Sequence, residues 1–181
     1  IRELILSGGD PLSLNDRRLR ELSQGITHIA HLKRLRIHTR QPIVLPERVD
    51  DSFLSWLDSI NLQKVMVLHV NHPHELSTEV IRACQRLTQQ GVKLLNQSVL
   101  LKGVNDSAQV LITLSEALFD AGIQPYYLHL LDRVQGAAHF EVLETTAQTL
   151  MHSLIEQLPG FLVPKLVREV PGHTSKTPVG F

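Results

Sequence analysis

A lysine near the end of the chain has the most distinctive chemistry in this sequence. Lys176 lies in the polar stretch His173-Thr174-Ser175-Lys176-Thr177-Pro178. A lysine in a polar tail is ordinarily solvated and inert. A Schiff-base lysine instead needs a neutral amine, which burial or nearby positive charge favours. The residue types alone leave both interpretations open.

Two carboxylates stand at the expected ends of strands. Asp132 closes the apolar segment Tyr126–Leu131, and Glu169 comes seven residues before Lys176. Paired carboxylates at the mouth of a barrel hold an ammonium group through charge-assisted hydrogen bonds. The alternative, which the residues alone favour, is a pair of solvated surface charges.

Two adjacent glycines follow the first expected strand, in Ser7-Gly8-Gly9-Asp10-Pro11. Glycines let the backbone approach a ligand closely, and N–H groups there bind a carboxylate or a phosphate. The simpler interpretation is a tight turn whose aspartate caps a helix, and the tripeptide alone favours that turn.

Three histidines fall within six residues, from His69 to His74. Pro73 interrupts the i, i+4 spacing of a helical metal site, so a loop histidine that binds a cofactor or substrate is favoured over a metal ligand.

The single cysteine, Cys84, lies on the apolar stripe of a helix and is expected to be a buried structural thiol. One cysteine excludes an internal disulfide and an iron–sulfur cluster held by this chain alone.

Alternating strands and amphipathic helices must position these residues. Apolar spacing predicts strands at Glu3–Ser7, Arg34–Thr39, Lys64–Val70, Lys93–Leu101, Pro125–Leu131 and Val163–Val170. It predicts helices at Asn15–Ala30, Asp51–Ile60, Ser77–Gln90, Asn105–Ala121 and Thr145–Leu158, with Gly25 ending or kinking the first. This alternation indicates an α/β fold with a parallel sheet, either doubly wound or part of a β/α barrel. Polar clusters such as His38-Thr39-Arg40 fall at strand ends, where barrel enzymes place their chemistry.

Composition narrows the class of protein further. The 181 residues are expected to form one domain, 1–181, with an irregular tail at 171–181. Eighteen basic residues balance eighteen acidic ones, which argues against a bulk electrostatic binder of nucleic acid. No apolar run approaches the ~20 residues of a membrane span, and the single thiol fits a reducing cytoplasm. The chain begins with Ile1, inside an apparent strand, so we expect a fragment of a longer protein.

Taken together, these segments resemble the lysine 2,3-aminomutase family of radical S-adenosylmethionine (SAM) enzymes. The likeness spans nearly the whole chain, and its segments follow one another in the family's order. The combination of segments is specific to the family, although no single segment is. The matching stretches are 4–11 (LILSGGDP), 40–48 (RQPIVLPER), 71–73 (NHP), 96–106 (NQSVLLKGVND), 125–127 (PYY) and 175–179 (SKTPV).

The likeness is nearest to the bacterial branch that makes (R)-β-lysine for the modification of elongation factor P. Residues 131–140 (LDRVQGAAHF) and Ser175-Lys176 resemble that branch. The catabolic relatives place a zinc-binding cysteine where this chain has Ser107, so a structural zinc is not expected.

The resemblance implies a partial (β/α) barrel of radical SAM type, with about six parallel strands and a cluster loop that would lie upstream. It implies three cofactors: SAM, a [4Fe–4S] cluster whose ligands would also lie upstream, and pyridoxal 5′-phosphate (PLP). Lys176 maps to the PLP lysine, and Asp132 and Glu169 map to carboxylates beside the ammonium of substrate lysine. The family has Asp where Glu169 stands. Gly8, Gly9 and Asp10, with His69 and Gln97, map to positions near SAM.

The implied activity is a radical 1,2-amino migration that converts L-lysine into β-lysine, an isomerase reaction. The β-lysine ligase and elongation factor P are the implied pathway partners, with no direct nucleic-acid or membrane partner, and the oligomeric state is left open. The family's three-cysteine motif is absent, so these 181 residues alone are expected to be inactive. Two alternatives stay open: a non-radical lyase or aldolase using Lys176 as a Schiff base, and a non-catalytic binding domain.

Overall fold

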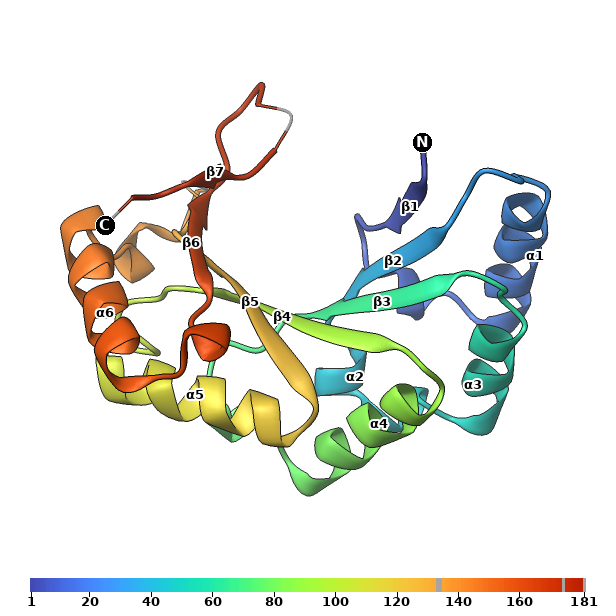
Figure 1. Cartoon of the computed structure of the whole chain (residues 1–181), viewed down its shortest axis with the longest axis horizontal. Coiled ribbons are helices and arrows are strands. Elements are labelled where there is room, and N and C mark those ends of the chain that lie inside the picture. Colours follow the sequence, from blue (N-terminus) through green and yellow to red (C-terminus); the bar gives the residue numbers. More distant parts are fainter. Residues whose placement is uncertain (133–134, 174, 181) are drawn as a thin grey trace. The chain divides into compact units, whose positions relative to one another are not determined.

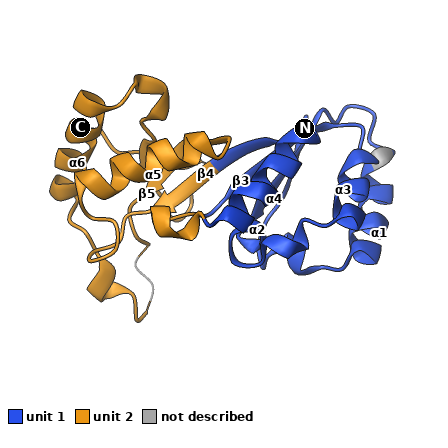
Figure 2. Cartoon of the chain, turned by 90° about the horizontal axis from the view of Figure 1, so that it is seen from below, with its two compact units in different colours: residues 1–69, 77–95 blue, residues 70–76, 96–181 orange. Residues whose placement is uncertain are grey.

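The computed structural model describes residues 1–132, 135–173 and 175–180. The chain forms two compact units (Figure 2), each described here by itself. The first comprises Ile1–His69 and Ser77–Leu95, and the second comprises Val70–Leu76 and Asn96–Phe181. The prediction of one domain over 1–181 stays a prediction.

The first unit is built on three parallel strands, β1 (Glu3–Leu6), β2 (Arg34–Thr39) and β3 (Gln63–Leu68). Their register pairs Leu6 with Ile37, and Ile37 with Met66. Because the strands are parallel, their carboxyl ends lie at one edge of the sheet. The helices of this unit are α1 (Asp16–Thr27), α2 (Gln41–Val44), α3 (Asp51–Asp58) and α4 (Thr78–Gln89).

Local sequence explains where these helices begin. Asn15, Asp50 and Ser77 are N-caps, and each side chain accepts a hydrogen bond from a backbone N–H of the first turn. The sequence leaves open whether Gly25 ends or kinks α1; the helix runs on to Thr27, so Gly25 does not end it. A glycine in a helix costs only about 0.5–1 kcal/mol, and burial of Leu19 and Ile26 on the same helix offsets that cost.

The second unit contains the parallel pair β5 (Ile123–His129) and β6 (Lys165–Arg168), in which Leu128 pairs with Leu166. A two-residue strand, β7 (Thr177–Pro178), pairs antiparallel with β6. Two helices, α5 (Ala108–Asp120) and α6 (Glu144–Gln157), pack against each other. β4 (Lys93–Val99) contributes its first three residues to the first unit and the rest to the second.

Hydrogen bonding gives the strand order β1-β2-β3-β4-β5-β6-β7, so strands adjacent in the sheet follow one another in the chain (Figure 1). This order, with helices between the strands, agrees with the predicted parallel α/β class. Short 3-10 helices join the elements: η1 (Pro11–Ser13), η2 (Pro46–Arg48), η3 (Pro73–Glu75), η4 (Ala138–Phe140) and η5 (Gly160–Leu162).

Strand β7 lies inside the segment 171–181, which the sequence predicts to be irregular; residues 174 and 181 of that segment lie outside the described residues. The physical cause is the burial of Val179, which is 6% exposed and belongs to the apolar cluster of the second unit. Its N–H also donates to the carbonyl of Leu166 at 3.0 Å. Among the residues that the structure describes, no helix has the length and apolar character needed to span a membrane.

Candidate functional site

The diglycine loop follows β1 in the first unit. Gly8 and Gly9 have φ angles of 78° and 51°, in the region that glycine adopts readily and other residues rarely do. A Cβ placed on either residue would meet nothing within 4 Å. The loop therefore needs glycine for its conformation, and there is open space beside its exposed backbone.

The carboxylate of Asp10 holds the end of this loop in place through hydrogen bonds. Its Oδ1 accepts from Leu12 N–H at 3.0 Å and from the Thr39 hydroxyl at 2.6 Å, and its Oδ2 accepts from Arg40 N–H at 2.7 Å. The contact with Leu12 caps η1, as the turn interpretation expects. Two of these hydrogen bonds, from Thr39 and Arg40, therefore tie the loop after β1 to the end of β2.

Arg48 holds the same segment by a second set of contacts. Its guanidinium donates to the carbonyls of Leu12 and Leu14 at 3.0 and 3.1 Å, and to Asp16 at 2.7 Å. It also lies 4.9 Å from the centre of the Phe53 ring. Sequence reasoning missed Thr39 and Arg48 as supports of the loop, although both stand in stretches that it singled out.

His69 follows the end of β3 in the first unit. Its ring meets that of His38 edge-on at 6.4 Å between centroids, and His38 lies on the neighbouring strand β2. The parallel register of β2 and β3 brings the two histidines to the same sheet edge. His69 therefore lies at a strand end, where the sequence predicts functional residues.

The other two histidines of the 69–74 run have structural contacts in the second unit. The His72 ring nitrogen accepts from the backbone N–H of His74 at 3.2 Å, and Glu75 accepts from the N–H groups of Asn71 and His72. These bonds form a capping box at the start of η3. Within the described ranges, no group of three or more His, Cys, Asp or Glu side chains could hold a metal ion.

Gln97 lies on β4 in the second unit and is half-buried. Its neighbours Asn96 and Ser98 are 2% and 5% exposed, and both donate to the carbonyl of Val70. Because side chains alternate along a strand, Gln97 points to the opposite face from these two. Gln97 therefore lies on the less buried face of β4.

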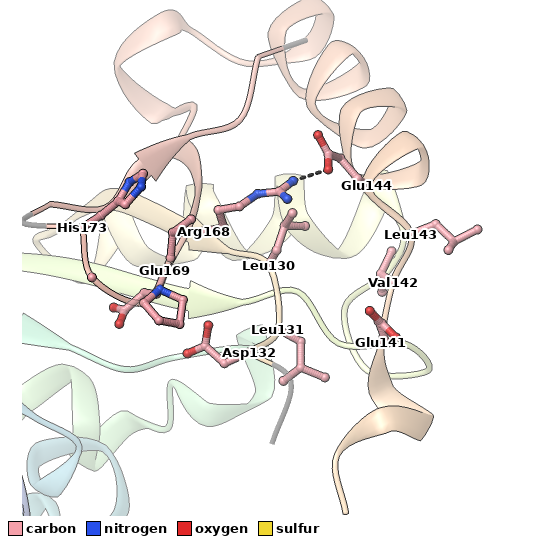
Figure 3. Close-up of a pocket in the computed structure, with 13 residues that line it drawn as sticks. Leu130, Leu131, Asp132, Glu141, Val142, Leu143, Glu144, Arg168, Glu169 and His173 are labelled. Carbon is pink, nitrogen blue, oxygen red and sulfur yellow. Dashed lines mark hydrogen bonds and ion pairs between the residues drawn. The ribbon is translucent and has the colours of Figure 1, made fainter. Parts of the chain in front are cut away.

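Asp132 and Glu169 line one open pocket of about 1030 Å³ in the second unit. They follow β5 and β6, whose parallel pairing continues to the hydrogen bond from Leu130 N–H to the Val167 carbonyl. Figure 3 shows both carboxyl groups turned to the same side, while Arg168 turns away to pair with Glu144. Both carboxylates are exposed, and residues 133–134 lie outside the described residues.

Lys176 contacts one of these carboxylates directly. Its Nζ lies 2.5 Å from Glu169 Oε1 and 5.8 Å from the centre of the Tyr127 ring. The Lys176 side chain is 24% exposed, whereas that of Glu169 is 55% exposed. The Tyr127 ring in turn lies 5.8 Å from that of the buried His129. Sequence reasoning quoted the tyrosine pair only as part of a motif and assigned it no role.

Two residues that the sequence singled out, Glu169 and Cys84, have pKa values displaced from their usual ones. The hydrogen bond from Lys176, helped by its positive charge, lowers the pKa of Glu169 below its usual value of 4.5. Burial raises the pKa of the Cys84 thiol to about 12. The carboxylate therefore stays ionised to lower pH than an isolated one, and the thiol stays protonated at neutral pH.

The predicted site residues thus divide between the two units. Gly8, Gly9, Asp10 and His69 lie at the sheet edge of the first unit, and Gln97 lies on the β4 segment of the second. Within the second unit, Asp132, Glu169 and Lys176 come together, with Glu169 shared between the pocket and the lysine.

The α/β fold is similar to that of solved radical SAM proteins. A radical SAM methyltransferase from Sphaerobacter thermophilus matches with a TM-score of 0.66 over 93% of this chain and 51% of its own, at 16% identity. A domain of a pyruvate-formate lyase-activating enzyme from Bacteroides vulgatus ATCC 8482 matches with a TM-score of 0.59 over 92% of this chain and 98% of its own, at 13% identity. The predicted fold class is confirmed.

Curated relatives give a more particular result. Proteins named L-lysine 2,3-aminomutase match this chain at 52% identity in Haemophilus influenzae and 50% in Escherichia coli K12, each over 98% of this chain and 52% of the relative. The protein of that name from Clostridium subterminale is 36% identical over 99% of this chain and 43% of its own. The chain therefore spans about half the length of the curated relatives it matches. No family model matches it. The resemblance to the lysine 2,3-aminomutase family is confirmed.

Proposed function

We propose that the protein to which this chain belongs is an L-lysine 2,3-aminomutase, an isomerase that converts L-lysine into β-lysine by a radical 1,2-amino migration. The observation that carries the proposal is the grouping of Lys176, Glu169 and Asp132 after β5 and β6. An amine that could hold an aldehyde cofactor lies beside carboxylates that could hold a cationic substrate. The curated relatives of that name support the same activity.

Lys176 fits the role of the PLP lysine. Its amine lies at the edge of a pocket of about 570 Å³, which Tyr127 also lines, so an aldehyde has access to it. PLP supplies stabilisation of an unpaired electron next to the migrating nitrogen. The residues of this chain would anchor it through Lys176 and present the Tyr127 ring to it.

Asp132 and Glu169 are proposed to bind the terminal ammonium of L-lysine. Two carboxylates turned to one side of a pocket favour a substrate with a distal positive charge. A substrate without that charge would leave their mutual repulsion uncompensated, which provides selection for lysine. Glu169 has one more methylene than the family's aspartate, so it reaches further along the pocket.

Gly8, Gly9, Asp10, His69 and Gln97 are proposed to contact or position SAM. The diglycine loop fits this role because its backbone is exposed, open and held in one conformation by Asp10. SAM, reduced by an iron–sulfur cluster, supplies the radical that removes a substrate hydrogen. The residues of this chain do not fit that cluster, because Cys84 is its only cysteine and is buried. Its ligands must come from elsewhere.

We further propose that the β-lysine product serves the modification of elongation factor P in the cytoplasm, through a β-lysine ligase. The stretch 131–140 and the pair Ser175-Lys176 support this branch of the family. Part of the first stretch, residues 133–134, lies outside the described residues.

The test is anaerobic turnover of L-lysine by the protein extended by the residues that precede Ile1, with its cluster reconstituted and with SAM and PLP added. We expect β-lysine from the wild type, loss of at least about a thousandfold in Lys176→Ala, and unchanged turnover in Lys93→Ala, an exposed lysine at the start of β4. Turnover by Lys176→Ala at the wild-type rate would remove the assignment of the PLP lysine. Turnover of a carbonyl substrate without SAM or iron would favour the lyase alternative.

A further inference from the structure

The antiparallel pairing of β6 and β7 determines which residues lie opposite each other near the end of the chain. Arg168 pairs with Thr177. The next positions outward in the same register are Glu169 and Lys176. Directly opposed residues in an antiparallel pair have Cβ atoms about 4.5–5.5 Å apart. The backbone therefore brings this carboxylate and this amine together before any ligand is bound.

Side-chain alternation separates this pair from its neighbour. Arg168 turns to one side and pairs with Glu144, whereas Glu169 turns to the other (Figure 3). Lys176 meets Glu169 on that other side, with Nζ 2.5 Å from Oε1. The Tyr127 ring faces the same ammonium at 5.8 Å, a separation at which a ring face attracts a cation. A carboxylate and a ring thus hold the amine from two directions.

We propose that Glu169 is a positioning residue for Lys176, which it holds at the rim of the pocket whenever the amine is not bonded to an aldehyde. This inference rests on the proposed function, because it gives a second task to a carboxylate assigned to the substrate. Glu169 carries one negative charge, so it cannot fully compensate the Lys176 ammonium and a substrate ammonium together.

The experiment measures how available the Lys176 amine is to a reagent that needs no cofactor. The full chain is treated with a limiting amount of N-hydroxysuccinimide acetate, and acetylation of each lysine is followed by peptide mass spectrometry. Wild type is compared with Glu169→Gln and with Glu144→Gln, which removes the neighbouring carboxylate that pairs with Arg168. Lys165 serves as the internal reference, and thermal unfolding verifies that each variant is folded.

We expect Glu169→Gln to speed acetylation of Lys176 by about two- to fivefold, the range for an ion pair exposed on one side. Glu144→Gln should leave that rate unchanged, and Lys165 should react alike in all three proteins. A purely structural role of Glu169 would raise the reactivity of neighbouring lysines together. Acetylation of Lys176 in Glu169→Gln at or below the wild-type rate would overturn the inference.

A second arm separates this inference from the proposed function. The same proteins are incubated with PLP, reduced with borohydride and analysed for modification of Lys176. Modification of Lys176, faster in Glu169→Gln, supports both statements. If PLP leaves Lys176 unmodified while Glu169→Gln still speeds its acetylation, the assignment of Lys176 as the PLP lysine fails. The inference that Glu169 positions the Lys176 amine then stands. If PLP modifies Lys176 but Glu169→Gln changes neither rate, the inference fails and the cofactor assignment stands.

Discussion

At the residue scale, Asp10 stabilises the diglycine loop by accepting hydrogen bonds, two of them from backbone N–H groups. Its carboxylate accepts three hydrogen bonds, one of them from Thr39, which is 1% exposed. Asp10→Ala should lower the free energy of unfolding by about 2–3 kcal/mol, because a charged acceptor is lost and the buried Thr39 hydroxyl no longer has an acceptor for its proton. Chemical denaturation measures this, with the exposed Asp58→Ala as the control. Equal stability of the two variants would contradict the account.

Two glycines provide a matched test of backbone conformation. Gly8 has a φ of 78°, whereas Gly25 lies inside α1, and neither has an atom within 4 Å of an added Cβ. Gly8→Ala should therefore destabilise the fold by about 1–2 kcal/mol. Gly25→Ala should stabilise it by about 0.5–1 kcal/mol. Shifts of the same sign in thermal unfolding would mean that conformation does not decide the effect.

The lowered pKa of Glu169 predicts an acid-dependent contribution to stability. A carboxyl group with a lower pKa in the folded state stabilises the fold above its unfolded-state pKa. That contribution is lost as the pH falls through the folded-state pKa. Because the Glu169 side chain is 55% exposed, the contribution should be below about 1 kcal/mol. Denaturation at pH 7 and near pH 3 should show a smaller pH difference in Glu169→Gln than in the wild type; an equal difference would contradict this.

At the scale of elements, the apolar periodicity of the sequence predicted the longer helices and strands and missed the short ones. The helix patterns led to α1, α3, α4, α5 and α6, and β1 to β6 each overlap a predicted strand, because burial of one face imposes a period on the sequence. The two-residue β7 and the four-residue α2 have too few positions to show a period. Strand β7 depends on Val179 reaching an apolar cluster built from distant residues, which no local pattern contains.

The segment after β4 is held by a buried amide, which gives a prediction at this scale. Asn105 is 0% exposed; its Oδ1 accepts from Leu101 N–H at 2.7 Å, and its Nδ2 donates to the carbonyls of Asn71 and Val99. Asn105→Ala should cost about 3 kcal/mol, since three backbone groups lose their partner. The exposed Asn61→Ala is the control in chemical denaturation. A cost below about 1 kcal/mol would show that water replaces the amide at this site.

At the scale of the molecule, residue types and the family resemblance singled out Lys176, Asp132 and Glu169 but not the contact between Lys176 and Glu169. The sequence placed Glu169 beside a substrate ammonium, and the structure shows it paired with Lys176. That contact depends on the register of β6 and β7, which is set by long-range pairing. Thr39 and Arg48 were missed as loop supports for the same reason, because their partners lie about 30 residues or more away.

The last prediction concerns what the 181 residues do alone. Iron–sulfur clusters are held by several thiolates, and the only cysteine of this chain is Cys84, buried with its pKa raised to about 12. Anaerobic reconstitution of the chain with iron and sulfide should therefore give no protein-bound iron and no visible cluster absorbance. The control variant Cys84→Ala should give the same result as the wild type. Under the proposed function, a longer form of the protein that carries the family's three-cysteine motif should give both the bound iron and the absorbance. Stoichiometric iron bound by the chain alone, and lost in Cys84→Ala, would show that this thiol leaves the core to bind a cluster. The proposal that the cluster ligands come from outside these 181 residues would then be wrong.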